Sequence, residues 1–151
     1  MAVNVGQRNV KETPSNSQCY AVDACYSLLI HTLKITANGG IFTPEHSDLT
    51  AYIRSLTAGI YTCAFTANKI RVTTPKGYTK RTENQESSIT GLTELLGLIP
   101  VARALFHLRG KKVQYWVKLT KEALDLVVRW HDSDVERYSD FCPNNSSGCR
   151  L

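Results

Sequence analysis

The residue types that carry out catalysis or hold metal ions are spread along this chain and do not gather in motifs. The chain contains Cys19, Cys25, Cys63, Cys142, Cys149, His31, His46, His107 and His131. No two cysteines have the C-x-x-C spacing of a zinc site, and no pair of histidines has the spacing that would complete one. We therefore expect no metal ion and no cofactor.

Motifs for nucleophilic, phosphoryl-transfer or hydride-transfer chemistry are also missing. The sequence contains no G-x-S-x-G, no P-loop, no H-E-x-x-H and no G-x-G-x-x-G. His31 and His107 fall on amphipathic segments, where a structural histidine is several times commoner than a catalytic base. Cys142 and Cys149 are near enough in sequence to bridge, but in a reducing cytoplasm we expect free thiols. The sequence predicts a protein that is not an enzyme.

The charge of the chain points to a different kind of function. The net charge is +5 and the pI is near 9.0. An excess of positive charge favours a polyanionic partner such as RNA or DNA, contacted through its phosphates. The candidate phosphate contacts are Arg54, Lys69, Arg71, Lys76, Lys80, Arg81, Arg103, Arg109, Lys111, Lys112, Lys118, Lys121 and Arg129. The alternative is a helical protein–protein scaffold whose charge serves only solubility.

Helices must position these side chains, because apolar residues recur every three or four positions in four segments. We expect helices near 17–37, 43–70, 83–109 and 112–132. Thr43 is a suitable N-cap, with Pro44 at the first helical position. The short connections near 38–41 and 109–111 favour antiparallel neighbours. The predicted fold is an all-α, antiparallel four-helix bundle, with a basic loop or small hairpin between the second and third helices.

The rest of the chain is expected to flank this bundle. We predict a flexible N-terminal arm over 1–18, the bundle over 19–132 and a C-terminal tail over 133–151, of which 133–141 could also extend the last helix. The basic stretch 69–81 has the residue types of a turn or of a β-hairpin. Pro100 lies inside the third helix and should bend or split it.

Two further expectations concern packing and location. Gly59, in the second helix, would let a neighbouring helix approach closely.

No apolar run approaches the ~20 residues of a bilayer span. The first residues also lack the apolar core of a secretory signal. We expect a cytoplasmic protein with no membrane partner.

The helix pattern resembles a known family of four-helix bundles. This family contains the accessory variability determinant of diversity-generating retroelements and the intervening-sequence proteins of bacterial large-subunit ribosomal RNA genes. The resemblance covers about Tyr20 to His131. The residues that carry it are Phe42-Thr43-Pro44-Glu45, Arg54, Leu92, Glu94-Leu95-Leu96, Ala102-Arg103, Lys112-Val113-Gln114-Tyr115-Trp116, Glu122-Ala123-Leu124 and Arg129-Trp130.

The resemblance implies a specific function. The accessory protein is not an enzyme; it is a pentamer of four-helix protomers with a basic surface that binds nucleic acid. It associates with the retroelement reverse transcriptase and its template RNA, and the complex makes adenine-mutagenised cDNA. The resemblance thus implies a homo-oligomer with a reverse transcriptase and RNA or DNA as partners. The intervening-sequence branch of the family is the alternative.

Overall fold

Four long helices make up most of the protein. The computed structural model describes residues 16–37 and 42–142. Its elements in chain order are α2 (Asn16–Ile35), the 3₁₀ turn η2 (Pro44–His46), α3 (Ser47–Lys69), α4 (Pro75–Phe106), α5 (Gly110–Arg137) and the 3₁₀ turn η3 (Ser139–Phe141). The described residues contain no strand, so the expectation of an all-α bundle is confirmed.

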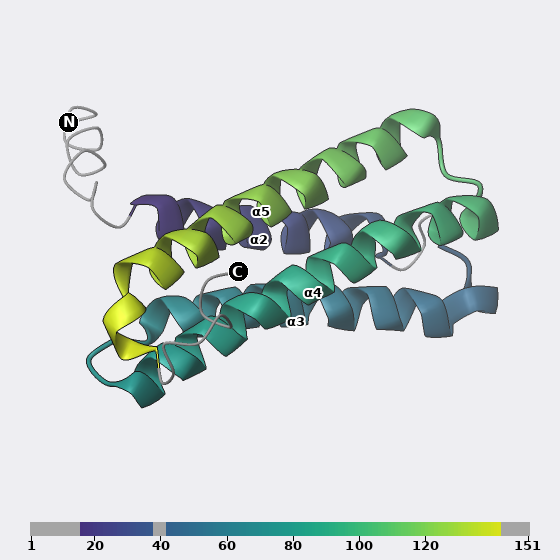
Figure 1. Ribbon diagram of the computed structural model, residues 1–151. Helices are drawn as coiled ribbons and strands as arrows, with labels where there is room; N and C mark the ends of the chain where they lie inside the picture. The colour runs from purple at the N-terminus through teal and green to yellow at the C-terminus, as the bar shows by residue number, and fades with distance from the viewer. Residues whose placement is uncertain (1–15, 38–41, 143–151) are drawn as a thin grey trace, which may run out of the picture.

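The helices form an elongated bundle in which each packs against two others (Figure 1). Neighbours in sequence pack together, and α5 closes the bundle against α2. Along three of these pairs, the residue number on one helix falls as its partner's number rises, which is the pattern of antiparallel packing. Between α2 and α3, Tyr26 contacts Tyr61 and Leu33 contacts Arg54. Between α3 and α4, Tyr52 contacts Glu94 and Ile60 contacts Ser88. Between α4 and α5, Arg81 contacts Asp134 and Glu86 contacts His131.

The core is built from one buried stripe on each helix. On α5 this stripe consists of Val113, Trp116, Thr120, Ala123, Val127, Trp130 and Asp134. Both tryptophans are almost completely buried, as their place on the apolar stripe predicts. The indole N–H of Trp116 donates to Thr32 Oγ1 on α2 at 3.0 Å, so this polar atom is satisfied within the core.

Helix α4 begins at Pro75, well before the start near Glu83 that the sequence predicts. Thr74 is its N-cap, and the Thr74 Oγ1 accepts a hydrogen bond from the backbone N–H of Gly77 at 3.0 Å. Pro75 takes the first helical position, where its fixed φ and missing N–H cost nothing. Only residues 70–74 connect α3 to α4, so the loop is shorter than the predicted stretch 69–81, and it is not a hairpin.

The far end of α4 also differs from the prediction. The helix runs through Pro100 without splitting and ends at Phe106, not at Gly110. His107 adopts the left-handed conformation with φ of 53°. The backbone N–H of Leu108 then donates to the carbonyl of Arg103 at 3.3 Å. This is a Schellman-type ending, in which glycine usually takes the position that His107 has here.

The bundle is longer than its predicted boundaries. Helix α5 continues to Arg137, and Asp134 is 1% exposed, so 133–137 belong to the bundle and not to a tail. Helix α2 begins at Asn16, inside the segment expected to be an arm. The rest of the predicted arm, 1–15, and of the predicted tail, 143–151, lies outside the described residues. Cys142 is disulfide-bonded, so the expectation of a free thiol is wrong for this residue.

Helix α4 also bears on the expectation about membranes. By length and composition it contains a window apolar enough to cross a bilayer, contrary to what the sequence predicted. The core helix of a bundle meets the same criterion, and α4 packs against both α3 and α5. The cytoplasmic location therefore stays a prediction.

Candidate nucleic-acid interface

The predicted phosphate contacts do not share one surface. All except Arg54 and Arg81 are exposed, and the exposed ones fall into three groups. The first, which we call the α3–α4 basic turn, consists of Lys69, Arg71, Lys76 and Lys80. The second, the α4–α5 basic turn, consists of Arg103, Arg109, Lys111 and Lys112. The third lies along α5 and consists of Lys118, Lys121 and Arg129.

Arg81 is a core residue and not a phosphate contact. It is 5% exposed, and its Nε donates to Asp134 Oδ2 at 2.6 Å. Its Nη1 donates to the carbonyls of Ala67 and Ile70 at 3.3 and 3.0 Å. The guanidinium also lies 5.3 Å from the ring centroid of Trp130. The prediction for Arg81 is therefore wrong, because its charge is neutralised inside the bundle, where it joins α3, α4 and α5.

Arg54 has a structural role as well. It is half-buried, and its Nη1 donates to the carbonyl of Leu33 at 3.1 Å and to Thr36 Oγ1 at 2.6 Å. A cation at the C-terminal end of a helix satisfies the last carbonyls and complements the helix dipole. Arg54 thus holds the end of α2 against α3, and it is half-buried where the other predicted contacts on the surface are exposed.

The α4–α5 basic turn has the most concentrated positive charge. Between residues 95 and 121 the chain has no acidic residue. Helix α5 begins at Gly110 with no side-chain N-cap and no acid in its first turn, where Lys111 and Lys112 stand instead. A Cβ placed on Gly110 would be 4.0 Å from the Arg103 Nη2, so that guanidinium reaches the start of α5. The unpaired N–H groups and the helix dipole add to the positive potential.

The positive region extends onto the end of α2. His31 on α2 packs edge-on against Tyr115 on α5, with 4.9 Å between ring centroids. Burial, followed by the charges of Lys112 and Lys34, lowers the pKa of His31 below its usual 6.5. Both lysines are therefore close enough to act on one imidazole. The ends of α2 and α4 and the start of α5 contribute cations to the same region.

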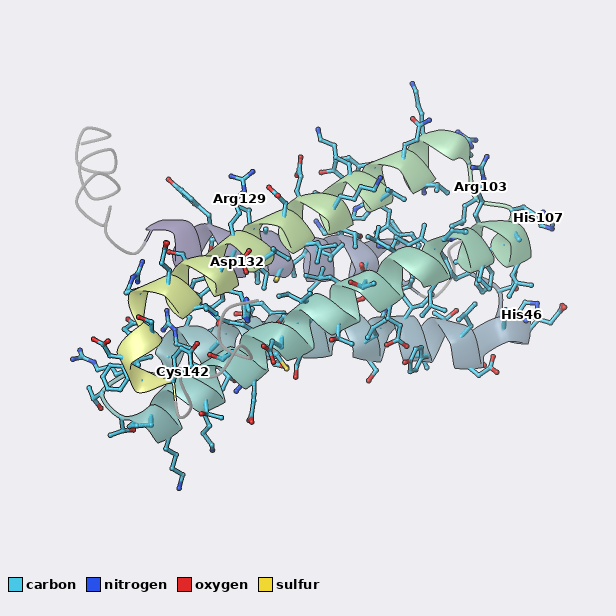
Figure 2. The ribbon with its side chains drawn as sticks, in the orientation of Figure 1. His46, Arg103, His107, Arg129, Asp132 and Cys142 are labelled. Atoms are coloured by element: carbon cyan, nitrogen blue, oxygen red, sulfur yellow. The ribbon has the colours of Figure 1, made fainter. Side chains whose placement is uncertain are left out.

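The other two groups are separated from this region or partly neutralised. At 1.5 Å per residue, Lys76 and Arg103 lie about 40 Å apart along α4. Arg129 pairs with Asp125, four residues earlier on α5, at 2.5 Å. Figure 2 shows Arg103 and His107 at one end of the bundle, with Arg129 farther along α5. A single phosphate cannot contact both basic turns of one chain.

The face between α3 and α4 has the opposite charge. An open groove there is lined by Leu56, Glu83, Glu86, Ser87, Thr90, Gly91 and Glu94. The Glu86 Oε2 lies 3.1 Å from His131 Nε2, and Glu94 accepts a hydrogen bond from the Tyr52 hydroxyl. Carboxylates repel phosphate, so this face does not suit a nucleic acid.

The side chains that could do covalent or metal chemistry do not converge. Within 20–37 and 42–142, no three metal-ligating side chains stand together. Burial raises the pKa of Cys25 to about 12, so this thiol is scarcely ionised near neutral pH. In the part of the chain that the structure describes, the exposed cations can bind anions by charge.

Asp134 is the residue that the sequence analysis missed. It was expected in the C-terminal tail or in an extension of the last helix, with no role in the core, yet it anchors Arg81 and accepts a second hydrogen bond from Gln85 Nε2 at 2.8 Å. A signal was present, because Asp134 follows Trp130 by four residues and Val127 by seven, on the same stripe. A carboxylate at a core position requires a cation or donors from a neighbouring helix.

Comparisons with known proteins identify no relative of this chain. The chain matches no protein-family model, no curated protein and no solved structure. The resemblance to the retroelement accessory proteins therefore rests on the residue pattern alone, and the nucleic-acid interface rests on the geometry of the basic turns.

Proposed function

We propose that this protein is a non-catalytic accessory protein that binds nucleic acid through the α4–α5 basic turn. Its partners in this proposal are the reverse transcriptase and the template RNA of a diversity-generating retroelement, and its role is to support mutagenic cDNA synthesis. The observation that carries the binding part is the group of four exposed cations, Arg103, Arg109, Lys111 and Lys112, at a helix start that has no acidic residue.

The physics of this end favours a phosphate backbone. Lys111 and Lys112 stand at the positive end of the α5 dipole, where a cation destabilises the helix and an anion stabilises it. A bound phosphate would relieve this repulsion and release condensed counterions from the nucleic acid. The cations here are contributed by two helices and a turn that the Schellman ending of α4 holds in place.

The reverse-transcriptase part of the proposal is supported by the resemblance of the helix pattern. The same resemblance makes a pentamer the expected oligomer, and sedimentation velocity of the whole chain measures this. A reverse transcriptase gene beside an adenine-rich repeat in the neighbouring DNA would support the retroelement branch. Absence of both would favour the intervening-sequence branch.

A salt titration with two matched double variants tests the nucleic-acid part. K111Q/K112Q removes two exposed lysines at the start of α5, and K76Q/K80Q removes two at the start of α4. Fluorescence anisotropy with a labelled single-stranded RNA gives the slope of log affinity against log salt concentration. We expect K111Q/K112Q to weaken binding and to make this slope shallower by about 1.4, at ~0.7 per lost phosphate contact. We expect a smaller effect from K76Q/K80Q.

Two outcomes would contradict the proposal. Absence of RNA binding at low salt would remove the nucleic-acid function and favour a scaffold whose charge serves solubility. Unchanged affinity and an unchanged salt slope in K111Q/K112Q would remove the α4–α5 basic turn from the interface. Circular dichroism of both variants checks that the bundle stays folded.

A further inference from the structure

Three aromatic rings form a continuous row on the outer face of α2 and α3. Tyr26 on α2 and Phe65 on α3 are 51% and 41% exposed, and Tyr61 between them is half-buried. The ring centroids of Tyr26 and Tyr61 are 5.8 Å apart, as are those of Tyr61 and Phe65. We call Tyr26, Tyr61 and Phe65 the aromatic row. Tyr26 and Phe65 lie outside the buried core, whereas Tyr61 packs against it.

The aromatic row is apolar surface that the folded chain leaves uncovered. The inward stripe of α3 is made by other residues, among them Ile53, Ile60 and Ala64. Single exposed aromatic residues are common, but a contiguous patch of them marks a binding surface. Phe65 has no polar atom that water could satisfy. Burying its exposed face against a flat partner is therefore favourable.

The charge next to the aromatic row identifies the partner. The Lys69 Nζ lies 5.1 Å from the ring centroid of Phe65, one turn farther along α3. The α3–α4 basic turn then continues with the exposed residues Arg71, Lys76 and Lys80. Aromatic rings for bases, followed by cations for phosphates at the end of α3, in the connection and at the start of α4, are what single-stranded nucleic acid needs. In a duplex the bases already stack on each other and are not available to such rings.

We infer that the aromatic row and Lys69 form a stacking site for the unpaired bases of a single-stranded nucleic acid. This inference rests on the proposed nucleic-acid function and names the class of nucleic acid and a second contact region. The α4–α5 basic turn supplies charge to any phosphate backbone, whereas the aromatic row selects strands whose bases are exposed. It also gives the α3–α4 basic turn a part in binding, as the place where the phosphates of the stacked nucleotides lie.

The test compares one probe in two forms. Fluorescein-labelled oligodeoxythymidine is titrated with the full chain, alone and after pairing with oligodeoxyadenosine. The variant Y26L/F65L keeps apolar bulk and removes the flat faces. Y52L removes a 48% exposed tyrosine from the same helix α3, on the side that contacts α4, and serves as the control. We expect Y26L/F65L to lose about tenfold or more in affinity for the single strand. Its affinity for the duplex and the affinities of Y52L should not change.

A crosslinking experiment uses the wild-type chain and so does not depend on the folding of any variant. Oligodeoxyuridine that contains 5-iodouracil is bound to the protein and irradiated, and the modified residues are identified by mass spectrometry. Crosslinks at Tyr26, Tyr61 or Phe65 support the stacking site. Crosslinks found only at the α4–α5 basic turn overturn it.

The outcomes separate this inference from the function on which it rests. If the wild-type chain binds neither probe at low salt, the proposed function itself fails. If it binds both and Y26L/F65L binds the single strand as tightly as wild type, the stacking site fails and the proposed function stands. Equal losses on both probes at an unchanged melting temperature would also overturn it. Loss of self-association by Y26L/F65L in sedimentation velocity, with oligonucleotide binding intact, would assign the aromatic row to contacts between copies of the chain.

Discussion

At the scale of single residues, the location of a charged side chain decides whether it stabilises the fold or is free to contact a ligand at the surface. Arg81 and Lys80 are neighbours in sequence, yet Lys80 is exposed and Arg81 is 5% exposed. Arg81 neutralises Asp134, bonds two carbonyls at the end of α3 and covers the Trp130 ring. Residue type alone does not distinguish the two side chains.

Removing either member of the Arg81–Asp134 pair should destabilise the bundle. The partner would be left as an uncompensated buried charge, which costs about 3–5 kcal/mol. We expect R81M and D134L each to lower the free energy of unfolding, measured by urea denaturation, by about this amount. The double variant should lose less than the sum of the two, because no lone charge remains.

The exposed neighbour provides the control for this pair. K80M should leave the free energy of unfolding unchanged, because Lys80 is exposed and surface charges contribute little. Additive losses in the double variant would mean that the two side chains do not depend on each other, in conflict with the 2.6 Å contact.

At the scale of helices, the sequence predicted the number and type of elements but not the start of α4. Periodicity identified the four helices because each must bury one apolar stripe. The start at Pro75 was missed because Val72, Thr73 and Tyr78 favour strands, and the N-cap at Thr74 was read as part of a turn. A helix that begins at Pro75 places Tyr78, Arg81 and Gln85 on its buried face. Without the correct start, the sequence does not assign these residues to that face.

The same error at the start of α4 explains why Arg81 was predicted to be a surface residue. Arg81 was taken as a loop residue, although it continues the stripe of Gln85, Ser88 and Leu92 once the helix begins at Pro75. Arg54 was correctly placed off the apolar stripe, but its hydrogen bonds to the end of α2 depend on how two helices pair, which periodicity does not encode. The α4–α5 basic turn was predictable, because its cations are local in sequence.

The sequence predicted a close approach of a neighbouring helix at Gly59. In the structure, the close approach of α3 and α4 occurs at Gly91 instead. A Cβ on Gly91 would lie 2.7 Å from Ile60 Cγ1, whereas a Cβ on Gly59 would have no atom within 4 Å. We expect G91A to lower the free energy of unfolding by about 1–3 kcal/mol, because the helices would have to move apart. G59A should raise it by roughly 0.5–1 kcal/mol, since alanine favours a helix.

Thermal denaturation of the two alanine variants measures this difference under identical conditions. The substitutions add the same methyl group to helices that face each other, so their comparison isolates packing from helix propensity. Equal stabilisation by both would show that Ile60 moves without an energetic cost and that α3 and α4 are not closely packed at Gly91.

At the scale of the whole molecule, charge is divided between the ends and faces of the bundle. The α4–α5 basic turn has no acid close to it in sequence, and the groove between α3 and α4 is lined by three glutamates. Concentrating like charges at a helix start costs stability, and under the proposed function a bound phosphate offsets this cost. Stability and nucleic-acid binding should therefore respond in opposite directions to substitutions at this end.

The variant K111E/K112E tests this opposition. Acids in the first turn of α5 would complement the helix dipole, and we expect the melting temperature to rise by a few degrees. Affinity for single-stranded RNA should fall more than in K111Q/K112Q, because the reversed charges repel phosphate. A lower melting temperature would show that the two lysines support the fold, and would remove the argument that their positions serve binding.

His31 should report binding at this end through its proton. Burial and the charges of Lys112 and Lys34 lower its pKa below 6.5 in the free protein. A phosphate beside these lysines would offset their charge and raise the pKa of His31, so the complex would take up a proton that the free protein lacks. By linkage, affinity for RNA should then increase as pH falls through the raised pKa of His31 in the complex, and level off below its pKa in the free protein.

Anisotropy titrations across this pH range, with wild type and H31Q, measure the effect of that single imidazole. H31Q should lose part of the increase in affinity at low pH, because its side chain cannot be protonated. An NMR titration of the His31 ring should show the higher pKa directly in the presence of RNA. If RNA instead binds only at the α3–α4 basic turn, about 40 Å away along α4, screening by salt leaves His31 unaffected. Its pKa would then be the same with and without RNA, and the assignment of the α4–α5 basic turn would be wrong.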